Sequence, residues 1–363
     1  MIIGIDASKS AVTNRTGVEN FTYQLILALT KIETSNTFHL YTNKSLPKEI
    51  ISQPNFFERK SYFKRFFNKI FLPILLLRYK PDVYFQPLYS IPMFAPKKNV
   101  AVIHDLAYYK FPEAYSKSEI ASQKSSLSNI IKKSQKIACV SNSTKNDLIA
   151  LFPETKDKIE IIYPSCDQDA YHPIEKPRDP LGVGDYYFLF LGRLEERKNV
   201  LKIIEAFALL KEEIGLPHKL VLAGKPGYGY DKIADKIASL DPSIAKQIIM
   251  PGFVKQEDMG DLMSGATAFV YPSLYEGFGI PALEAMAAGT PVITANTSSL
   301  PEVVGDAAIS VSPTDADAIK DAMRDLATSP EKRNSLIEKG FIRIKEFSWE
   351  KSAQKLITIL ESL

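Results

Sequence analysis

The sequence has few cysteines and no long apolar run, and each absence excludes a class of protein. Its 363 residues include two cysteines, Cys139 and Cys166, and neither stands in a CxxC pair. A disulfide framework and a zinc site of the usual spacing are therefore not expected. The most apolar stretch, residues 70–77, is far shorter than the roughly 20 residues that cross a bilayer. The first residues lack the basic and apolar regions of a signal peptide, so we expect a cytoplasmic protein without a transmembrane helix.

A strong charge bias is absent as well. The formal net charge is +3, which is too small to argue for a nucleic-acid partner, and we expect none. Apolar residues make up 45% and charged residues 24% of the chain, as in ordinary globular domains, which argues against disorder. Since one hydrophobic core usually stops growing at roughly 250 to 300 residues, the length predicts two domains.

What the sequence does contain is a regular alternation of short apolar runs and helical periodicity, typical of parallel α/β sheets. Around residues 167–184 this periodicity fails and prolines and glycines gather, which indicates a linker. The alternation then restarts with the run YYFLFLG. In the first half we predict strands over residues 2–6, 38–42, 83–86, 100–104, 136–140 and 159–162, and helices over 17–30 and 119–133.

The predicted fold class is α/β, with two Rossmann-like doubly wound domains that face each other across a cleft. We place the first domain at residues 1–172 and the second at 173–346. Residues 347–363 form a final helix with no strand after it to cover, and we expect this helix to pack back on the first domain. Ligands bind at the carboxyl ends of the strands in such folds, so the loops that follow the strands should carry the chemistry.

The segment from Tyr275 to Glu284 carries the strongest local signal. A strand ends there in a Gly-containing turn and Pro281 occupies the first helical turn, so backbone N–H groups and a helix N-terminus face the ligand edge. Glu276 lies in the turn and Glu284 in the first turn of the helix, with seven residues between them. Both carboxylates can accept hydrogen bonds from the hydroxyls of one sugar-like ligand. The alternative is a surface helix with a glycine turn before it.

A second charged loop, from Gly192 to Asn199, also follows a predicted strand and precedes a helix. Arg193 and Lys198 offer one bidentate and one point-like cation, which suits a pyrophosphate whose negative charge grows as a bond breaks. We interpret the charges at residues 195–197 as solvated. Taken alone, such a loop is more often an ordinary surface loop. Because it stands at the same place in the fold as the first motif, after a strand and before a helix, the two together favour a binding site.

The two motifs together resemble the family 4 retaining glycosyltransferases, which have the GT-B fold. The resemblance covers nearly the whole chain and is strongest over residues 187–295. It implies that Arg193 and Lys198 hold the donor diphosphate, that Glu276 lies beside the transferred sugar, and that Glu284 binds the ribose hydroxyls. It also implies that backbone groups of Phe278, Gly279 and Ile280 face sugar and phosphate, and that the backbone near Phe253 and Val254 holds the nucleobase.

The resemblance extends to the first domain. In the run HDLAYYKFPEAYS, His104 corresponds to a histidine that contacts the outer hydroxyls of the donor sugar, and Asp105 follows it. The loop RTGVENF corresponds to a Gly-rich turn near the phosphate, although this sequence has only Gly17 where many relatives have two glycines. In the family, the leaving phosphate is thought to take the acceptor proton in a front-face substitution. A double displacement through Glu276 or Asp105 stays open as the alternative.

We expect neither a metal nor a cofactor apart from the nucleotide sugar as co-substrate. Arg193, Lys198 and the helix N-terminus at Pro281 can stabilise the leaving group without a divalent ion. Two DxD strings occur, and we predict that residues 167–169 form a loop and that residues 315–317 cap a helix.

Residues 58–80 combine seven lysines and arginines with one acidic residue, and aromatic residues stand between them. Basic and aromatic residues mixed in this way are typical of a helix that lies on anionic lipid. Since Pro73 interrupts the pattern, we expect the helix over residues 61–71. An ordinary surface helix that packs its aromatic stripe on the sheet is the alternative. For membrane or acceptor contact, at the cytoplasmic membrane face, the candidates are Lys60, Lys64, Arg65, Phe66 and Lys69.

The resemblance also implies a substrate class. Similar proteins often act in polysaccharide or O-antigen assembly, with mannose or a similar hexose, so we expect a GDP- or UDP-hexose donor and a saccharide or polyprenyl-linked acceptor. Two alternatives are a non-transferring enzyme of the same fold, such as a nucleotide-sugar 2-epimerase, and a catalytically silent membrane-attached scaffold. We expect Glu276→Ala and Lys198→Ala to nearly abolish transfer without unfolding the protein, since both side chains should line an open cleft.

Overall fold

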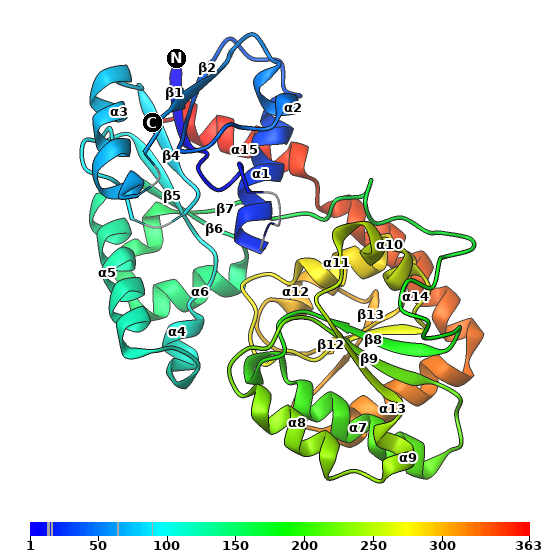
Figure 1. Ribbon diagram of the computed structural model, residues 1–363. Helices are drawn as coiled ribbons and strands as arrows, with labels where there is room; N and C mark the ends of the chain where they lie inside the picture. Colours follow the sequence, from blue (N-terminus) through cyan, green and yellow to red (C-terminus); the bar gives the residue numbers. More distant parts are fainter. Residues whose placement is uncertain (13–14, 16, 64, 89) are drawn as a thin grey trace. The chain divides into compact units, whose positions relative to one another are not determined.

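The structure is a computed structural model that describes residues 1–12, 15, 17–63, 65–88 and 90–363. The chain divides into two compact units, and both termini lie in the first of them (Figure 1). Residues 165–172, which the sequence placed in the first domain, lie in unit 2. Unit 1 comprises Met1–Tyr108, Ser116–Pro164 and Ser348–Leu363, and unit 2 comprises Tyr109–Tyr115 and Ser165–Phe347.

Unit 1 is built on a seven-stranded parallel sheet with the strand order β3-β2-β1-β4-β5-β6-β7. The chain runs outward from β1 on one side and from β4 on the other, so the switch point lies between these strands. The predicted strands agree closely with the observed ones, but edge strand β3 was missed because its charged sequence FFERK lacks the pattern of a buried strand. The strands are β1 Ile2–Asp6, β2 Thr37–Thr42, β3 Phe56–Lys60, β4 Val83–Gln86, β5 Asn99–Ile103, β6 Lys136–Cys139 and β7 Ile159–Ile161.

The helices of unit 1 begin where their capping residues stand. Ser116 and Glu119 form a capping box at the start of α5, and the Ser141 side chain accepts a hydrogen bond from Thr144 N–H at the start of α6. The final helix α15 lies beside α1, with the rings of Phe21 and Trp349 5.6 Å apart (Figure 1). The helices are α1 Gly17–Leu29, α2 Lys48–Ile51, η1 Phe67–Phe71, α3 Leu72–Tyr79, α5 Lys117–Lys133, α6 Asn142–Leu151, η3 Pro153–Lys158 and α15 Trp349–Glu361, and the short helix α4 Ala107–Lys110 begins in unit 1 and ends in unit 2.

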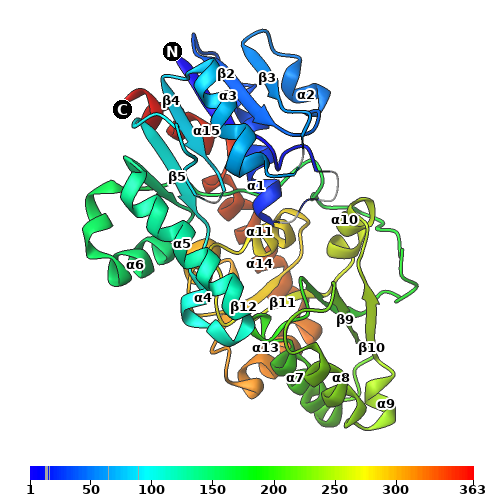
Figure 2. The same cartoon turned by 60° about the vertical axis from the view of Figure 1, so that its left-hand side comes forward.

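The helix predicted over residues 61–71 is wrong in position. A π-helical turn, η1, begins at Phe67 and continues directly into α3, which packs against β2 (Figure 2). Pro73 stands in the first turn of α3, where the missing N–H interrupts no helical hydrogen bond, so it starts this helix instead of ending the previous one. Phe66, just before η1, adopts a left-handed conformation with φ 61°.

Unit 2 is built on a six-stranded parallel sheet with the order β10-β9-β8-β11-β12-β13. Its switch point lies between β8 and β11. On the other side of β8, the glycines after β8 and β9 meet. A Cβ on Gly224 would lie 1.7 Å from the carbonyl oxygen of Gly192, so this close approach requires glycine. The strands are β8 Tyr187–Leu191, β9 Lys219–Ala223, β10 Ile248–Gly252, β11 Ala268–Tyr271, β12 Val292–Ala295 and β13 Ala308–Val311.

The predicted linker belongs to unit 2, because its side chains bind α10. Arg178 donates hydrogen bonds to the Asp261 carboxylate, the shorter of them 2.6 Å long, and Ile174 N–H donates to Ser264 Oγ. Among the helices that the structure describes, none is long and apolar enough to cross a membrane. The helices of unit 2 are η2 Pro112–Ala114, η4 Glu196–Lys198, α7 Val200–Glu213, α8 Tyr230–Ala238, α9 Pro242–Ala245, α10 Gln256–Ser264, α11 Ile280–Ala287, α12 Leu300–Val304, α13 Ala316–Thr328, α14 Pro330–Arg343 and η5 Ile344–Glu346.

Candidate functional site

At the switch point of unit 2, the loop after β8 binds the loop after β11. Lys198 Nζ lies 2.5 Å from Glu276 Oε1 and donates a hydrogen bond to the Tyr271 hydroxyl at 2.8 Å. The side chains of Lys198 and Glu276 are 13% and 9% exposed, so they form a nearly buried ion pair. The structure thus brings together two residues that the sequence predicted from separate motifs. The expectation that both side chains are open is wrong for this structure, since each is held by the other.

Arg197 completes this ion pair, and the sequence did not predict it. Its guanidinium donates to the Tyr275 carbonyl at 2.8 Å, lies 3.4 Å from Glu276 Oε2, and binds Glu195 Oε1 at 2.8 Å. The interpretation of residues 195–197 as solvated is wrong for Glu195 and Arg197, whose side chains are each 14% exposed. The short helix η4 is the cause, because it turns the Arg197 side chain inward while Glu196 binds the exposed Lys232.

The charges around Glu276 keep its carboxylate ionised. Burial raises its pKa, but the attraction of Lys198 and Arg197 outweighs burial and brings the pKa down to about 2. Both carboxylate oxygens are therefore occupied by cations, and the group carries a fixed negative charge at neutral pH.

Two serines hold the Glu276 turn, and sequence reasoning missed both. Ser298 Oγ and Ser299 Oγ donate to the Glu276 carbonyl at 2.6 and 3.0 Å, and Ser299 Oγ also lies 2.7 Å from the Phe278 carbonyl. The signal in the sequence was the run of three hydroxyl residues at 297–299, which follows the apolar run PVITA. Hydroxyl side chains in loops often bind backbone groups.

The turn ends at the N-terminus of α11. Gly279 precedes the helix with φ 113°, and a Cβ there would lie 2.7 Å from Leu300 Cδ2, so glycine is required. Within the described part of the chain, the N–H groups of Gly279 and Ile280 donate to no acceptor. Free N–H groups at a helix N-terminus form an anion site. Phe278 is buried, with its ring edge on Phe347.

Glu284 lies in the second turn of α11 and not in the first, because the helix begins at Ile280. Burial, and then the nearby Asp167 carboxylate, raise its pKa to about 8. Over the described residues its carboxyl group forms no hydrogen bond or ion pair, so it is free to bind a ligand hydroxyl.

The remaining donor-site candidates of unit 2 follow neighbouring strands. The Arg193 side chain follows β8, is 68% exposed, and has Glu195 Oε2 3.8 Å away as its nearest carboxylate. Phe253 follows β10 and is exposed, with Lys225 Nζ 4.7 Å from its ring centre, whereas Val254 is buried. The exposed cation and the exposed ring lie at the same edge of the sheet.

In unit 1, the His104 ring follows β5 and is neutral. Its Nε2 lies 2.9 Å from the Pro87 carbonyl, which can only accept, so Nε2 carries the proton and Nδ1 is left as an acceptor. Burial lowers the pKa of His104 and outweighs the opposite effects of Pro87 and Asp105. The Asp105 carboxylate accepts a hydrogen bond from Ala107 N–H at 2.9 Å at the start of α4, so it already has a capping contact. Gly17 is the first residue of α1, and a Cβ there would meet no described atom within 4 Å.

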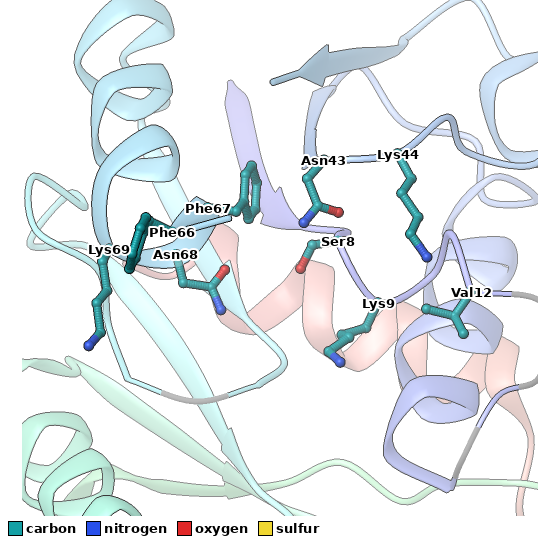
Figure 3. Close-up of a pocket in the computed structure, with 9 residues that line it drawn as sticks. All are labelled: Ser8, Lys9, Val12, Asn43, Lys44, Phe66, Phe67, Asn68 and Lys69. Atoms are coloured by element: carbon teal, nitrogen blue, oxygen red, sulfur yellow. The ribbon is translucent and has the colours of Figure 1, made fainter. Parts of the chain in front are cut away.

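A pocket of about 420 Å³ in unit 1 contains two of the predicted basic and aromatic residues, Phe66 and Lys69 (Figure 3). Arg65 is exposed, and Lys60 Nζ donates to Ser45 Oγ, so neither lines the pocket. Lys64 lies outside the described residues. The nine lining residues are Ser8, Lys9, Val12, Asn43, Lys44, Phe66, Phe67, Asn68 and Lys69.

Both DxD strings have structural roles. Asp167 Oδ1 accepts hydrogen bonds from Asp169 N–H and Ala170 N–H in a loop, and Asp315 caps α13 through Ala318 N–H, as predicted. In the part of the chain that the structure covers, no group of three or more His, Cys, Asp or Glu side chains is arranged to hold a metal ion.

Comparison with known proteins matches both units to sugar-transferring families. Residues 173–343 match the family model of glycosyl transferases group 1, and residues 15–170 match that of glycosyltransferase family 4. The chain is similar to the O-antigen chain mannosyltransferase B of Escherichia coli, with 32% identity over 78% of this chain and 75% of that protein.

Solved structures share the fold at low sequence identity. Sucrose-phosphate synthase from Thermosynechococcus elongatus superposes with a TM-score of 0.76 at 18% identity, over 99% of this chain and 98% of that one. Alr3699/HepE from Anabaena, in complex with UDP and glucose, gives 0.72 at 17% identity, over 100% and 99%. With its two parallel sheets, the chain therefore has the two-domain GT-B fold.

Proposed function

Because this chain belongs to the family 4 glycosyltransferases, we propose that it moves a hexosyl group from a nucleotide diphosphate sugar with retention of the anomeric configuration. Unit 2 binds the donor in this proposal, and unit 1 supplies the acceptor side. The observation that carries it is the set of groups at the switch point of unit 2: the ion pair of Lys198 with Glu276, the exposed Arg193, and the free N–H groups of α11.

These groups match the charge that develops in such a reaction. As the bond between the anomeric carbon and the phosphate oxygen breaks, negative charge grows on the diphosphate and positive charge grows on the sugar. Arg193 and the N–H groups of Gly279 and Ile280 stabilise the diphosphate, and Lys198 adds to them. The ionised Glu276 stabilises the sugar. Because cations and N–H groups supply the positive charge, we propose that the reaction needs no divalent metal and no cofactor.

The contacts of Glu276 favour a front-face substitution over a double displacement. A nucleophilic carboxylate needs an oxygen that can approach the anomeric carbon, but both Glu276 oxygens bind cations. One oxygen of the Asp105 carboxylate, Oδ1, accepts a hydrogen bond from a backbone N–H. We therefore propose that the acceptor oxygen forms its bond to the anomeric carbon on the face that the phosphate leaves, and that the leaving phosphate oxygen takes the acceptor proton.

The other candidates position the donor. Glu284 binds the ribose hydroxyls, since its carboxyl group has no other partner among the described residues, and the backbone at Phe253 and Val254 holds the base. In unit 1, the Nδ1 atom of His104 accepts a hydrogen bond from an outer hydroxyl of the sugar. No described atom lies within 4 Å of a Cβ at Gly17, so the described residues leave room for a phosphate at the N-terminus of α1.

The relatives suggest the substrate class. The Escherichia coli relative is a mannosyltransferase of the O-antigen chain, and Alr3699/HepE was solved with UDP-glucose. We propose a GDP- or UDP-hexose donor, with mannose as the first sugar to test, and a saccharide acceptor, free or polyprenyl-linked, in cell-surface polysaccharide assembly. A cytoplasmic location, at the membrane face, belongs to the same proposal.

The test is a donor panel in EDTA. UDP-, GDP- and ADP-hexoses are incubated with the protein, with and without a polyprenyl-diphosphate-linked sugar, and NMR gives the anomeric configuration of the product. Transfer of one sugar with retention in EDTA supports the proposal. Transfer only with added divalent metal overturns the metal-independent part, and an inverted product overturns the retaining part.

The same panel separates the two alternatives. A 2-epimerase-like enzyme would change the donor sugar without an acceptor, and a silent scaffold would bind nucleotide and turn over nothing. The ion pair of Glu276 with Lys198 argues against both alternatives, because the negative charge of Glu276 would stabilise the positive charge that develops on the transferred sugar.

A further inference from the structure

The helical segment η1–α3 of unit 1 has two apolar faces, and only one is covered. Phe67, Leu72 and Leu76 pack with Tyr41 and Tyr84 in the core. The opposite face is exposed over residues three to four positions apart, which places them in one row along the helix. These residues are Phe66, Ile70, Ile74 and Leu77, and their exposed fractions lie between 48% and 53%.

The exposed row continues onto two neighbouring segments. Tyr62 and Phe63, before the helix, are 88% and 64% exposed. Met93 and Phe94 are exposed too, and the next residue, Ala95, packs against the same core cluster as α3. We call these eight exposed side chains the apolar face. A group of exposed apolar side chains of this size on a globular protein marks an interaction site.

The charged residues near the apolar face in the sequence are basic with one exception. Between Lys60 and Lys98 the sequence has eight lysines and arginines and one acidic residue, Asp82. The Asp82 carboxylate accepts a hydrogen bond from Ile2 N–H at 2.6 Å, so it is engaged elsewhere. Throughout the described chain no carboxylate lies within ion-pair distance of six basic side chains that stand near these residues in the sequence, which are Arg65, Lys69, Arg78, Lys80, Lys97 and Lys98.

The pocket shares Phe66 with the apolar face, and Lys69 is among its other lining residues. Figure 3 shows Ser8, Asn43 and Asn68 pointing toward one another, from the ends of β1 and β2 and from η1. Three of the nine lining residues are lysines, and one of them, Lys9, forms an ion pair with Glu19 at 3.1 Å. Over the described residues, the Asn43 and Asn68 amides and the Lys44 ammonium have no hydrogen-bond partner, so they are free to bind a ligand.

From these observations we propose that the apolar face docks on an anionic lipid bilayer and that the adjacent pocket binds the phosphate-linked sugar of a lipid-held acceptor. The inference rests on the proposed function and names its acceptor class. Exposed aromatic and aliphatic groups enter the interface of a bilayer while surrounding cations meet its anionic headgroups. Lys44, Lys69 and the two amides of the pocket suit phosphate oxygens and sugar hydroxyls, and Phe66 at the shared edge suits a sugar ring.

A protein partner fits these features less well. A protein that covered this face would need a matching apolar surface with acidic residues around it, whereas an anionic bilayer supplies both in any orientation. The pocket would then stand at the depth of lipid headgroups, where a diphosphate that links a sugar to a lipid lies.

The bilayer part is tested by flotation with vesicles of phosphatidylcholine alone or with phosphatidylglycerol, without any donor. We expect binding to the anionic vesicles only, and at least tenfold weaker binding by Ile70→Ser/Ile74→Ser and by Lys97→Glu/Lys98→Glu. The matched controls are Ile342→Ser and Lys246→Glu, which change exposed residues of unit 2. Circular dichroism verifies that each variant is folded. Equal binding by the face variants and the controls overturns the proposal.

The pocket part is tested with Lys44→Ala and Asn68→Ala. We expect KM for a short-chain lipid-diphosphate-linked sugar to rise at least tenfold, with kcat nearly constant and with KM for the same free sugar little changed. An equal rise in both KM values would mean that the pocket does not read the phosphate, and no rise would mean that it does not bind the acceptor; either result overturns the proposal. Vesicle binding needs no transfer, so if binding persists but no sugar is transferred, it is the proposed function that has failed.

Discussion

Lys198 Nζ lies 2.5 Å from Glu276 Oε1, and this contact joins the loops after β8 and β11 where the strand order of unit 2 reverses. It links a residue of one predicted motif to a residue of the other across 78 positions of sequence. The ion pair is both a part of the proposed catalytic site and a structural tie between two loops, and the first predictions follow from this double role.

Removing either partner should cost stability as well as activity. Lys198→Ala or Glu276→Ala leaves a buried charge without its partner, and we expect each to lower the free energy of unfolding by about 3 to 5 kcal/mol. The double variant Lys198→Ala/Glu276→Ala should lose less than the sum of the two single losses, because it removes both charges of the pair. Transfer should fall at least roughly 100-fold in all three. Urea unfolding and initial rates measure these effects. If the loss of stability in the double variant equalled the sum of the two single losses, Lys198 and Glu276 would not interact in the folded protein.

Acid should weaken the fold through Glu276. Its folded pKa of about 2 lies below the ordinary 4.5, so its contribution to stability is complete above pH 4.5 and is lost as the pH falls toward 2. We expect the stability advantage of the wild type over Glu276→Gln to shrink by on the order of 3 kcal/mol over that window. Urea unfolding at a series of pH values measures it. A difference that does not change with pH would show that Glu276 is not held ionised.

For Glu284, we expect the stability of the fold to change with pH in the opposite direction. Its pKa is raised to about 8 in the folded protein, so folding favours the protonated group and stability falls as the pH rises from 4.5 to 8. Glu284→Gln mimics the protonated form and should become more stable than the wild type toward pH 8. The exposed Glu212→Gln is the control, and thermal unfolding at pH 5 and pH 8.5 compares the three proteins. An identical pH dependence for Glu284→Gln and the wild type would be evidence against the shift.

Gly17→Ala should separate stability from function. No described atom lies within 4 Å of the added Cβ, so the variant should fold as well as the wild type, but it fills the space into which the donor phosphate would enter. We expect kcat/KM to fall at least tenfold, which corresponds to a loss of about 1.4 kcal/mol. Gly215→Ala, which also meets no atom within 4 Å, is the matched control. Equal activity of both variants would remove Gly17 from the site.

His104 should bind a sugar hydroxyl as a neutral acceptor. His104→Ala should lower kcat/KM by roughly 10- to 100-fold, the effect of one hydrogen bond to a buried group. Donor sugars that lack the 4-hydroxyl or the 6-hydroxyl identify the hydroxyl that His104 binds. With the donor that lacks this hydroxyl, His104→Ala should cause no further loss of kcat/KM. If His104→Ala lowered kcat/KM by the same factor with both deoxy donors as with the full donor, the ring would have only a structural role.

The positions of most helices and strands could be predicted, because each is fixed by a local pattern such as the apolar run of β8 or the cap at Ser141. The helix after β3 was misplaced because a proline reads both as a stop and as a start, and the sequence alone does not say which. Edge strand β3 was missed because an exposed strand lacks the pattern of a buried one.

The candidate residues could be named from sequence, but their contacts could not. That Lys198 meets Glu276 depends on β11 lying beside β8, and strand order is a property of the assembled sheet. The inward turn of Arg197 depends on one short helical turn, and a charged run gives no sign of it. The pocket in unit 1 likewise combines ends of β1 and β2 with η1, which adjoin only in three dimensions.

The division of the chain has a consequence for the order of synthesis. Helix α15, in the last 16 residues, belongs to unit 1, where it covers α1. On the ribosome, unit 1 is made first but lacks this helix until the whole of unit 2 has been made. The apolar side of α1 around Phe21 must wait uncovered during that time. An N-terminal fragment that ends at residue 164 should therefore aggregate, and joining residues 348–363 to it should rescue its solubility.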